Sequence, residues 1–265
     1  MPELSEVKIV SDYINFHSKE RIFTKIYHVK KGNIPECDNI IENFSIVSET
    51  NGKELILKLF DGYKSIRISV FMGMSGNWLF LPTSDWFSRK FTRLRFDTND
   101  GNSLLLWGLY MGPKYRFGEF TGVKRGPDPT KEFEKFKQNI LDNLHKKAFD
   151  KPICEVLLDQ KYFNGVGNYL RSTILYYLDD NPFEIASKVI SKNNKILDLC
   201  REIPLKAYEL NGGQLQDWQN PFNADCSEFK NWVFYQKGLS IKDTTGRTFW
   251  YNKKWKNNNI YEINK

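Results

Sequence analysis

The chain has 265 residues, and its 40% hydrophobic and 15% aromatic content is ample for packed cores, which excludes a wholly disordered protein. A net charge of +7 favours a polyanionic partner, although an ordinary basic surface explains the charge equally well. There is no secretory signal, no apolar run of about 18 residues and no C-x-x-C pair. We therefore expect an intracellular protein of a reducing compartment, with no membrane span and no bound metal.

The first half of the chain predicts a short helix followed by antiparallel strands. Ser5 is a candidate cap for a helix whose apolar residues at 7–14 recur at helical spacing. Alternating apolar residues at 55–59 and 66–70 are typical of strands, and the turn at 99–101 lies between two further strands. This order predicts a β-sandwich with a leading helix.

The second half begins at a loop rich in turn residues, 126–129, and is mainly helical. Helical periodicity runs from Thr130, a candidate cap, to Leu144, and again over 169–178 and 193–209. The last forty residues are aromatic, basic and strand-like. We expect an α+β protein with two domains, residues 1–125 and 126–265.

The N-terminal pair Pro2-Glu3 is a candidate for nucleophilic catalysis. After removal of Met1, Pro2 has a free secondary amine, and an α-amino group titrates near about 7.7–8, against about 10.4 for lysine. Such an amine is a nucleophile at neutral pH, and Glu3 beside it is a candidate general acid or base. Taken alone, the two residues have a simpler interpretation. Pro2 is a common residue at the second position, and Glu3 is an acid at the start of a helix.

The segment Gly165-Val166-Gly167-Asn168 precedes a helix and is a candidate phosphate site. Backbone N–H groups at the positive end of a helix bind anions, and the Asn168 side chain adds a donor. Lys161 lies close enough along the chain to add a phosphate contact. The alternative is a turn between helices with no ligand.

These motifs together carry a resemblance to a known family. The start Met1-Pro2-Glu3-x-x-Glu6-Val7 and the run from Leu157 to Tyr176 resemble the formamidopyrimidine-DNA glycosylase/endonuclease VIII family. Within it the chain is similar to the vertebrate-type endonuclease VIII-like branch, nearly continuously from Lys124 to Tyr176. The resemblance implies a β-sandwich with a leading helix, then a helix-two-turn-helix domain with a zincless β-ribbon finger at about 236–257.

The resemblance also implies catalytic roles. Pro2 matches the Schiff-base nucleophile, Glu3 its acid/base partner, and Glu6 a carboxylate of the first helix that organises the site. Lys53 matches a hairpin lysine that contacts phosphate near the lesion and assists base loss.

Further residues match those that fill the gap left by an extruded nucleotide. Met74 matches the methionine of the first loop, and Phe117 the wedge of the second. Tyr115 stands where the family commonly has an arginine that stacks on the orphaned base. Whether Tyr115 or Arg116 takes that part stays open.

The C-terminal region matches the zincless finger over 243–251, with Arg247 expected to hold phosphates at its tip. Gln214 and Tyr235 match residues of the family's lesion pocket only when gaps are introduced into the match between the sequences. Thr173 replaces a glutamate that is frequent in relatives, and its role stays open.

We therefore expect a bifunctional DNA glycosylase/AP lyase of base excision repair that removes oxidised pyrimidines and oxidised or ring-opened purines. The resemblance implies a Schiff base from Pro2 and β,δ-elimination without a cofactor or metal. The expected protein is a monomer acting on damaged DNA, duplex or single-stranded, in the nucleus or, for a virus, in the cytoplasm or viral factory. The alternatives are a non-catalytic damage sensor and an RNA-binding helix-turn-helix protein.

Overall fold

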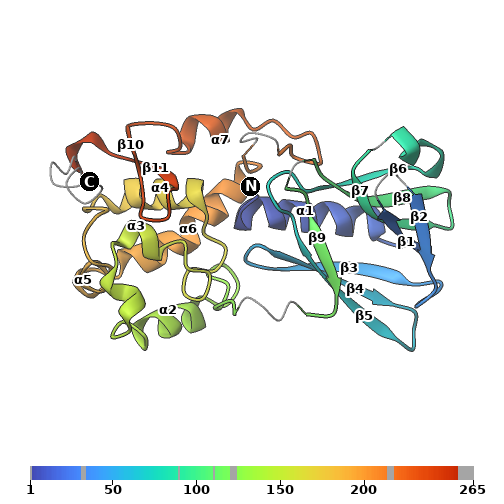
Figure 1. The fold of residues 1–265 in the computed structure, drawn as a ribbon, viewed down its shortest axis with the longest axis horizontal. Helices are drawn as coiled ribbons and strands as arrows, with labels where there is room; N and C mark the ends of the chain where they lie inside the picture. Colours follow the sequence, from blue (N-terminus) through green and yellow to red (C-terminus); the bar gives the residue numbers. More distant parts are fainter. Residues whose placement is uncertain are drawn as a thin grey trace. The chain divides into compact units, whose positions relative to one another are not determined.

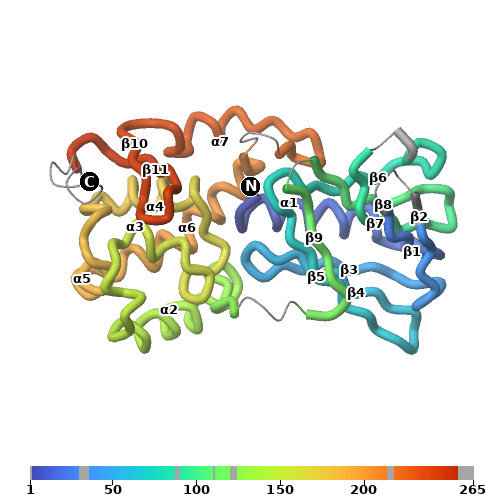
Figure 2. The backbone as a smooth tube through the Cα atoms, in the orientation of Figure 1, coloured from blue at the N-terminus to red at the C-terminus, as the bar shows by residue number. Residues whose placement is uncertain are grey.

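The computed structural model describes residues 2–30, 34–88, 90–109, 111–119, 124–213 and 218–255. The chain divides into two compact units (Figures 1 and 2). The first comprises Met1–Val123 and Ala207–Lys230, and the second comprises Lys124–Lys206 and Asn231–Lys265.

The first unit is a helix packed on two antiparallel sheets (Figure 1). The helix is α1 (Leu4–Ser18). The five-stranded sheet has the order β2 (Ile34–Asp38), β1 (Phe23–Lys30), β7 (Thr92–Thr98), β8 (Asn102–Trp107) and β6 (Asn77–Pro82), with η1 (Thr83–Ser88) after β6. The four-stranded sheet has the order β3 (Ser45–Asn51), β4 (Glu54–Phe60), β5 (Ser65–Phe71) and β9 (Lys114–Phe117).

One large core holds most of this unit together. Leu55, Leu57 and Leu59 of β4 are fully buried, as the period of two in the sequence predicts. They belong to one cluster with Val10 of α1 and Trp78 of β6. Each fully buried leucine contributes about 1.5–3 kcal/mol of transfer free energy, so the two sheets and the helix stabilise one another.

The second unit is helical and ends in a β-hairpin (Figure 1). Its helices are α2 (Phe133–Leu141), η2 (Lys147–Asp150), α3 (Ile153–Val156), α4 (Asn168–Leu178), α5 (Ala186–Lys192) and α6 (Lys195–Glu209). After α7 (Ser227–Trp232) come β10 (Leu239–Lys242), β11 (Thr248–Tyr251) and η3 (Lys253–Trp255). The chain passes from the second unit to the first within α6 and returns to the second within α7. We call the β10–β11 hairpin with its turn, residues 239–251, the finger.

The predicted fold is confirmed: a leading helix and β-sandwich are followed by a helical region with a C-terminal hairpin. Both predicted caps are wrong. The N-cap of α1 is Glu3 rather than Ser5, and α2 begins at Phe133 after Glu132. Thr130 instead bonds through its backbone N–H to the Asp128 carboxylate at 2.8 Å, so it closes the turn before the helix.

Candidate functional site

The start of α1 is fixed by a reciprocal arrangement of two acids. The Glu3 side chain accepts from the backbone N–H of Glu6, and the Glu3 N–H donates to Glu6 Oε2 at 2.9 Å. This is a capping box built from two glutamates. Both are almost fully buried, with 4% and 2% of their surface exposed. Pro2, also buried, is thereby held in a defined position at the positive end of the helix.

The second oxygen of Glu6 is engaged by the turn that follows α6. Glu6 Oε1 accepts from the backbone N–H of Gly213 at 3.0 Å. Gly212 before it has φ +66°, and a Cβ there would lie 2.7 Å from Ile9 Cδ1. Only glycine brings this turn so close to α1. Gln214, assigned to the lesion pocket, lies outside the described residues.

Lys53 occupies the two-residue turn between β3 and β4. Asn51 pairs with Glu54 across the turn, and Gly52 has φ +58° at the first central position, as in a type II′ hairpin. The tight turn fixes the direction in which half-buried Lys53 leaves the sheet.

Met74 lies in the loop between β5 and β6, which packs against the loop after β8. The backbone N–H of Met74 donates to the carbonyl of Met111 at 3.1 Å. Gly73 has φ +61°, and a Cβ there would lie 2.2 Å from that same carbonyl. Half-buried Met74 lines a cavity of about 980 Å³.

Tyr115 and Phe117 lie on the inward side of β9 and pack against the sandwich core. The Tyr115 hydroxyl bonds to His28 Nδ1 at 2.7 Å, and His28 Nε2 bonds to Asp38 Oδ2 at 2.8 Å. Burial raises the pKa of Tyr115 above its ordinary value. Arg116, on the opposite side of the strand, is exposed.

In the second unit the predicted phosphate site is a closed turn before α4. Gly165 has φ +92°, and its N–H donates to Gln160 Oε1 at 3.1 Å. Gly167 is the N-cap residue of α4. Lys161 is exposed, with its ammonium 5.4 Å from the Tyr162 ring. The turn therefore needs no ligand to be stable, and it presents the N-terminus of an 11-residue helix.

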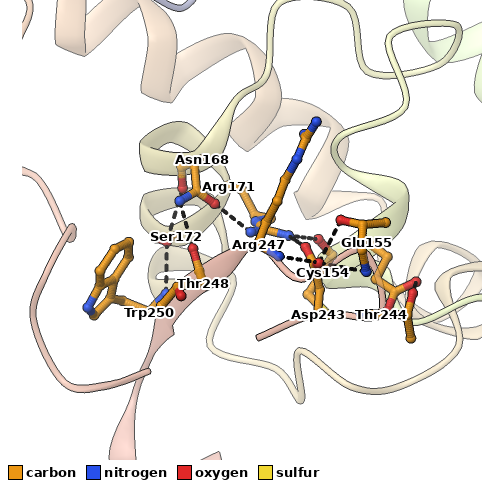
Figure 3. Close-up of polar contacts among 11 residues, drawn as sticks. Cys154, Glu155, Asn168, Arg171, Ser172, Asp243, Thr244, Arg247, Thr248 and Trp250 are labelled. Carbon is orange, nitrogen blue, oxygen red and sulfur yellow. Dashed lines mark hydrogen bonds and ion pairs between the residues drawn. The ribbon is translucent and has the colours of Figure 1, made fainter. Parts of the chain in front are cut away.

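Asn168, the first residue of α4, connects this turn to the finger. Its side-chain Nδ2 donates to the carbonyl of Thr248 in β11 at 2.7 Å (Figure 3). Its Oδ1 accepts from Arg171, one turn further along α4. One side chain thus fixes the finger strand that follows Arg247.

Arg171 forms the centre of the contact between α4 and the finger (Figure 3). It is fully buried and donates through the same nitrogen to Asp243 Oδ2 at 2.7 Å and to the Cys154 carbonyl at 3.0 Å. Its guanidinium also lies 4.7 Å from the Phe249 ring centroid. Sequence reasoning missed this residue, although an arginine that is the one charged residue of a mostly buried helix indicates a buried partner.

Asp243 in turn organises the finger turn. Its Oδ1 accepts from the backbone N–H groups of Thr245 at 3.0 Å and of Arg247 at 2.9 Å. Burial opposes its ionisation, but the hydrogen bonds from Arg171 and Thr245 outweigh that effect and hold the pKa of Asp243 below its ordinary value. Exposed Arg247 points away from this network in Figure 3.

Two hydroxyls of α4 hold the backbone of the finger and of the segment before it. Thr173 Oγ1 accepts from the N–H of Phe234 at 3.2 Å, and Ser172 Oγ accepts from the N–H of Trp250 at 3.2 Å. Half-buried Tyr235 meets the Trp250 ring edge to face, with centroids 4.4 Å apart. Thr173 therefore holds the backbone at Phe234, ahead of the finger.

The described part of the chain contains neither a metal-binding cluster nor a candidate membrane span. No group of three or more histidine, cysteine or acidic side chains there is placed to hold a metal ion. Nor does any helix in those ranges combine the length and apolar character that a membrane span requires.

Comparisons with known proteins agree with this architecture. The family model of the formamidopyrimidine-DNA glycosylase N-terminal domain matches residues 1–109. Human Endonuclease 8-like 1 is 31% identical over 95% of this chain and 72% of its own length. The formamidopyrimidine-DNA glycosylase of Ureaplasma parvum serovar 3 is 27% identical over 83% of this chain and 82% of its own length.

Solved structures show the same fold at low identity. The MutM (Fpg) protein of Thermus thermophilus superposes with a TM-score of 0.75 at 19% identity, covering 96% of this chain and 98% of that chain. Fpg (MutM) of Lactococcus lactis, solved with DNA containing N7-benzyl-Fapy-dG, gives a TM-score of 0.73 at 19% identity, covering 94% and 97%.

Proposed function

The chain belongs to the Fpg/Nei family of DNA glycosylase/AP lyases of base excision repair, and from this premise we propose that the amine of Pro2 is its nucleophile. The observation that carries the proposal is the buried Glu3–Glu6–Gly213 arrangement, which fixes Pro2 at the start of α1. The amine becomes available once Met1 is removed.

The proposed chemistry follows from a secondary amine. Pro2 N attacks C1′ of the damaged nucleotide, and the base leaves with the electron pair of the C1′–N bond. Loss of the amine proton and opening of the sugar ring give an iminium, for which Glu3 supplies a proton to the ring oxygen. The iminium acidifies the C2′ hydrogens, and successive β- and δ-elimination expel the phosphates on the two sides. Lys53 contacts the phosphate near the lesion, and Glu6 keeps Glu3 in place.

The proposed substrates are oxidised pyrimidines and oxidised or ring-opened purines. Support comes from relatives whose names state formamidopyrimidine-DNA glycosylase activity and from the Lactococcus lactis complex with a formamidopyrimidine lesion. Because an amine cannot reach C1′ of a stacked base, the nucleotide must leave the helix. Met74 then enters the gap, and Tyr235 lines the lesion pocket.

DNA binding is assigned to the second domain, residues 126–265, and the chemistry to residues 1–125. Asn168 and the turn at 165–167 contact phosphate at the N-terminus of α4, with Lys161 and Arg247 adding positive charge. This assignment is supported by the network that anchors Arg247 to α4 through Asp243.

Trapping with borohydride tests the nucleophile. The protein, with Met1 removal verified by mass, is mixed with a single-stranded oligonucleotide carrying an abasic site and then reduced. We expect a covalent adduct on the tryptic peptide from Pro2 to Lys8. A variant with one alanine inserted before Pro2 should give no adduct at Pro2, because that nitrogen is then an amide. An adduct on a lysine, or none with the processed protein, would contradict the proposal.

A further inference from the structure

The last turn of α6 and the turn that follows it are closed by two backbone hydrogen bonds. The N–H of Gly212 donates to the carbonyl of Ala207 at 2.7 Å, and the N–H of Asn211 donates to the carbonyl of Tyr208 at 3.0 Å. With Asn211 at φ +65°, this is the Schellman arrangement that ends many helices. Gly213, the next residue, is therefore held in a fixed position relative to the last turn of α6.

Tyr208 attaches this helix end to α1. Its hydroxyl donates to Asp12 Oδ2 at 2.7 Å, and Lys8 Nζ donates to the same oxygen at 3.0 Å. The Lys8 ammonium also lies 4.3 Å from the centroid of the Tyr208 ring. Burial and the hydrogen bond to Asp12 raise the pKa of Tyr208 above its ordinary value, so its hydroxyl stays a donor at neutral pH.

The contacts with the end of α6 follow one face of α1. Glu6, Ile9 and Asp12 are spaced three residues apart, so they lie on the same face of the helix. Tyr208 bonds to Asp12 at one end of this face, and Gly213 bonds at the other end, about 9 Å away along the helix axis. Between these points a Cβ at position 212 would lie 2.7 Å from Ile9 Cδ1, so the turn packs directly on α1. Two bonds so far apart oppose sliding of the turn along α1.

Glu6 connects the turn to the proposed nucleophile. One of its oxygens accepts from the N–H of Gly213, and the other accepts from the N–H of Glu3, the residue after Pro2. A turn that slides along α1 would lose its bond to Glu6 or pull Glu6 away from Glu3. The hydroxyl bond of Tyr208 opposes this movement.

We propose that Tyr208 is a positioning residue for the reaction at Pro2. Its hydroxyl keeps the Gly213 N–H on Glu6, and Glu6 holds the start of α1 in the geometry for attack. The proposal rests on the proposed function, in which Pro2 is the nucleophile. Tyr208 acts through Glu6 and not on the reacting atoms, so loss of its hydroxyl should slow the chemical step without weakening DNA binding.

The test uses Tyr208→Phe, which removes the hydroxyl and keeps the ring. Adduct formation with a single strand carrying an abasic site is trapped by borohydride over a range of protein concentrations, with protein in excess. This series separates the maximum rate from the half-saturating concentration. We expect the maximum rate to fall about threefold, because a displaced reacting group slows attack, and the half-saturating concentration to change by less than about 1.5-fold.

A double-mutant cycle with Glu6→Gln tests the route. The amide has one acceptor oxygen, so it cannot hold the N–H groups of Glu3 and Gly213 on two separate oxygens as the carboxylate does. With that connection broken, removal of the Tyr208 hydroxyl should have no further effect. We expect the double variant to react no more slowly than Glu6→Gln alone. Rate losses that multiply would mean that Tyr208 acts independently of Glu6, and the proposal would be wrong.

Tyr13→Phe is the matched control for a general loosening of α1. It removes another hydroxyl bond of this helix, which accepts from the Phe80 N–H at 3.0 Å, and leaves the turn after α6 unchanged. This variant should lower the melting temperature but keep the maximum rate of the wild type. Equal rate losses for Tyr13→Phe and Tyr208→Phe, or no loss for Tyr208→Phe, would overturn the positioning role. If the wild-type protein itself forms no adduct, the proposed function fails instead.

Discussion

The start of α1 and the finger each depend on a buried acid, but the two acids accept from different donors. Glu6 accepts from the neutral backbone N–H groups of Glu3 and Gly213. Asp243 accepts from backbone N–H groups as well, but it also accepts from the guanidinium of Arg171, which is itself fully buried. In the finger an ion pair is thus added to the oriented peptide groups.

This difference determines how each region responds to the loss of a negative charge. When a carboxylate is replaced by a neutral amide, a backbone N–H that donated to it makes a weaker hydrogen bond or none. A buried guanidinium left without its carboxylate remains as an uncompensated charge, which is far more costly. The finger, which has no metal-binding group among its described residues, is therefore the more vulnerable of the two.

The largest effect is expected for Asp243→Asn. The variant should lower the free energy of unfolding by about 3 kcal/mol, the lower end for breaking a buried pair, because the turn lies near the surface. Denaturant titration measures this loss. Affinity for a duplex containing an abasic-site analogue should also fall, because an uncompensated Arg171 weakens the contact between α4 and the turn that carries Arg247.

Asp225→Asn is the matched control. Asp225 also accepts from a backbone N–H two residues on, that of Ser227 at 2.9 Å, but it is exposed and has no buried arginine as partner. Because an asparagine keeps the oxygen that accepts from Ser227 and the position is exposed, this variant should change stability by less than about 0.5 kcal/mol. Equal losses in the free energy of unfolding for the two variants would show that the ion pair with Arg171 does not stabilise the fold.

A smaller effect is expected for Glu6→Gln. The amide keeps one acceptor, so the free energy of unfolding should fall by about 2 kcal/mol. Adduct formation at Pro2 should slow about tenfold, because the start of α1 is held less firmly. Glu49→Gln, which removes an exposed ion pair with Lys58, serves as the control. If Glu6→Gln is as destabilising as Asp243→Asn, the distinction between neutral and charged donors does not hold.

Much of the fold was predictable because local patterns carry it. The period of two in β4 and the turn at 99–101 predict strands that the structure contains. The caps were not predictable with the same certainty, because Ser5 and Thr130 are good capping residues by type. Glu3 displaced Ser5 because its carboxylate pairs reciprocally with Glu6.

Residues of the candidate site could be predicted only where they belong to a short, continuous stretch of sequence. Pro2 and Asn168 are recognisable from their neighbours in sequence. The partnership of Arg171 with Asp243 joins residues 72 positions apart, and no spacing rule predicts it. The hydrogen bond from the Met74 N–H to the Met111 carbonyl likewise joins two separate loops, so no local pattern predicts it.

Acid protonates Asp243 and so removes the same charge without a mutation. The pKa of Asp243 is lower in the folded protein than its unfolded value of about 3.9. A depressed pKa stabilises the folded state above the unfolded value, and this stabilisation is lost as the pH falls through the folded value. Unfolding midpoints of the wild type and of Asp243→Asn should therefore differ by a constant amount between pH 7 and about pH 5. Below about pH 4 the two curves should converge, because protonated Asp243 resembles the neutral asparagine. Parallel curves down to pH 3 would mean that the finger is held by the shape of its turn and not by the charge on Asp243.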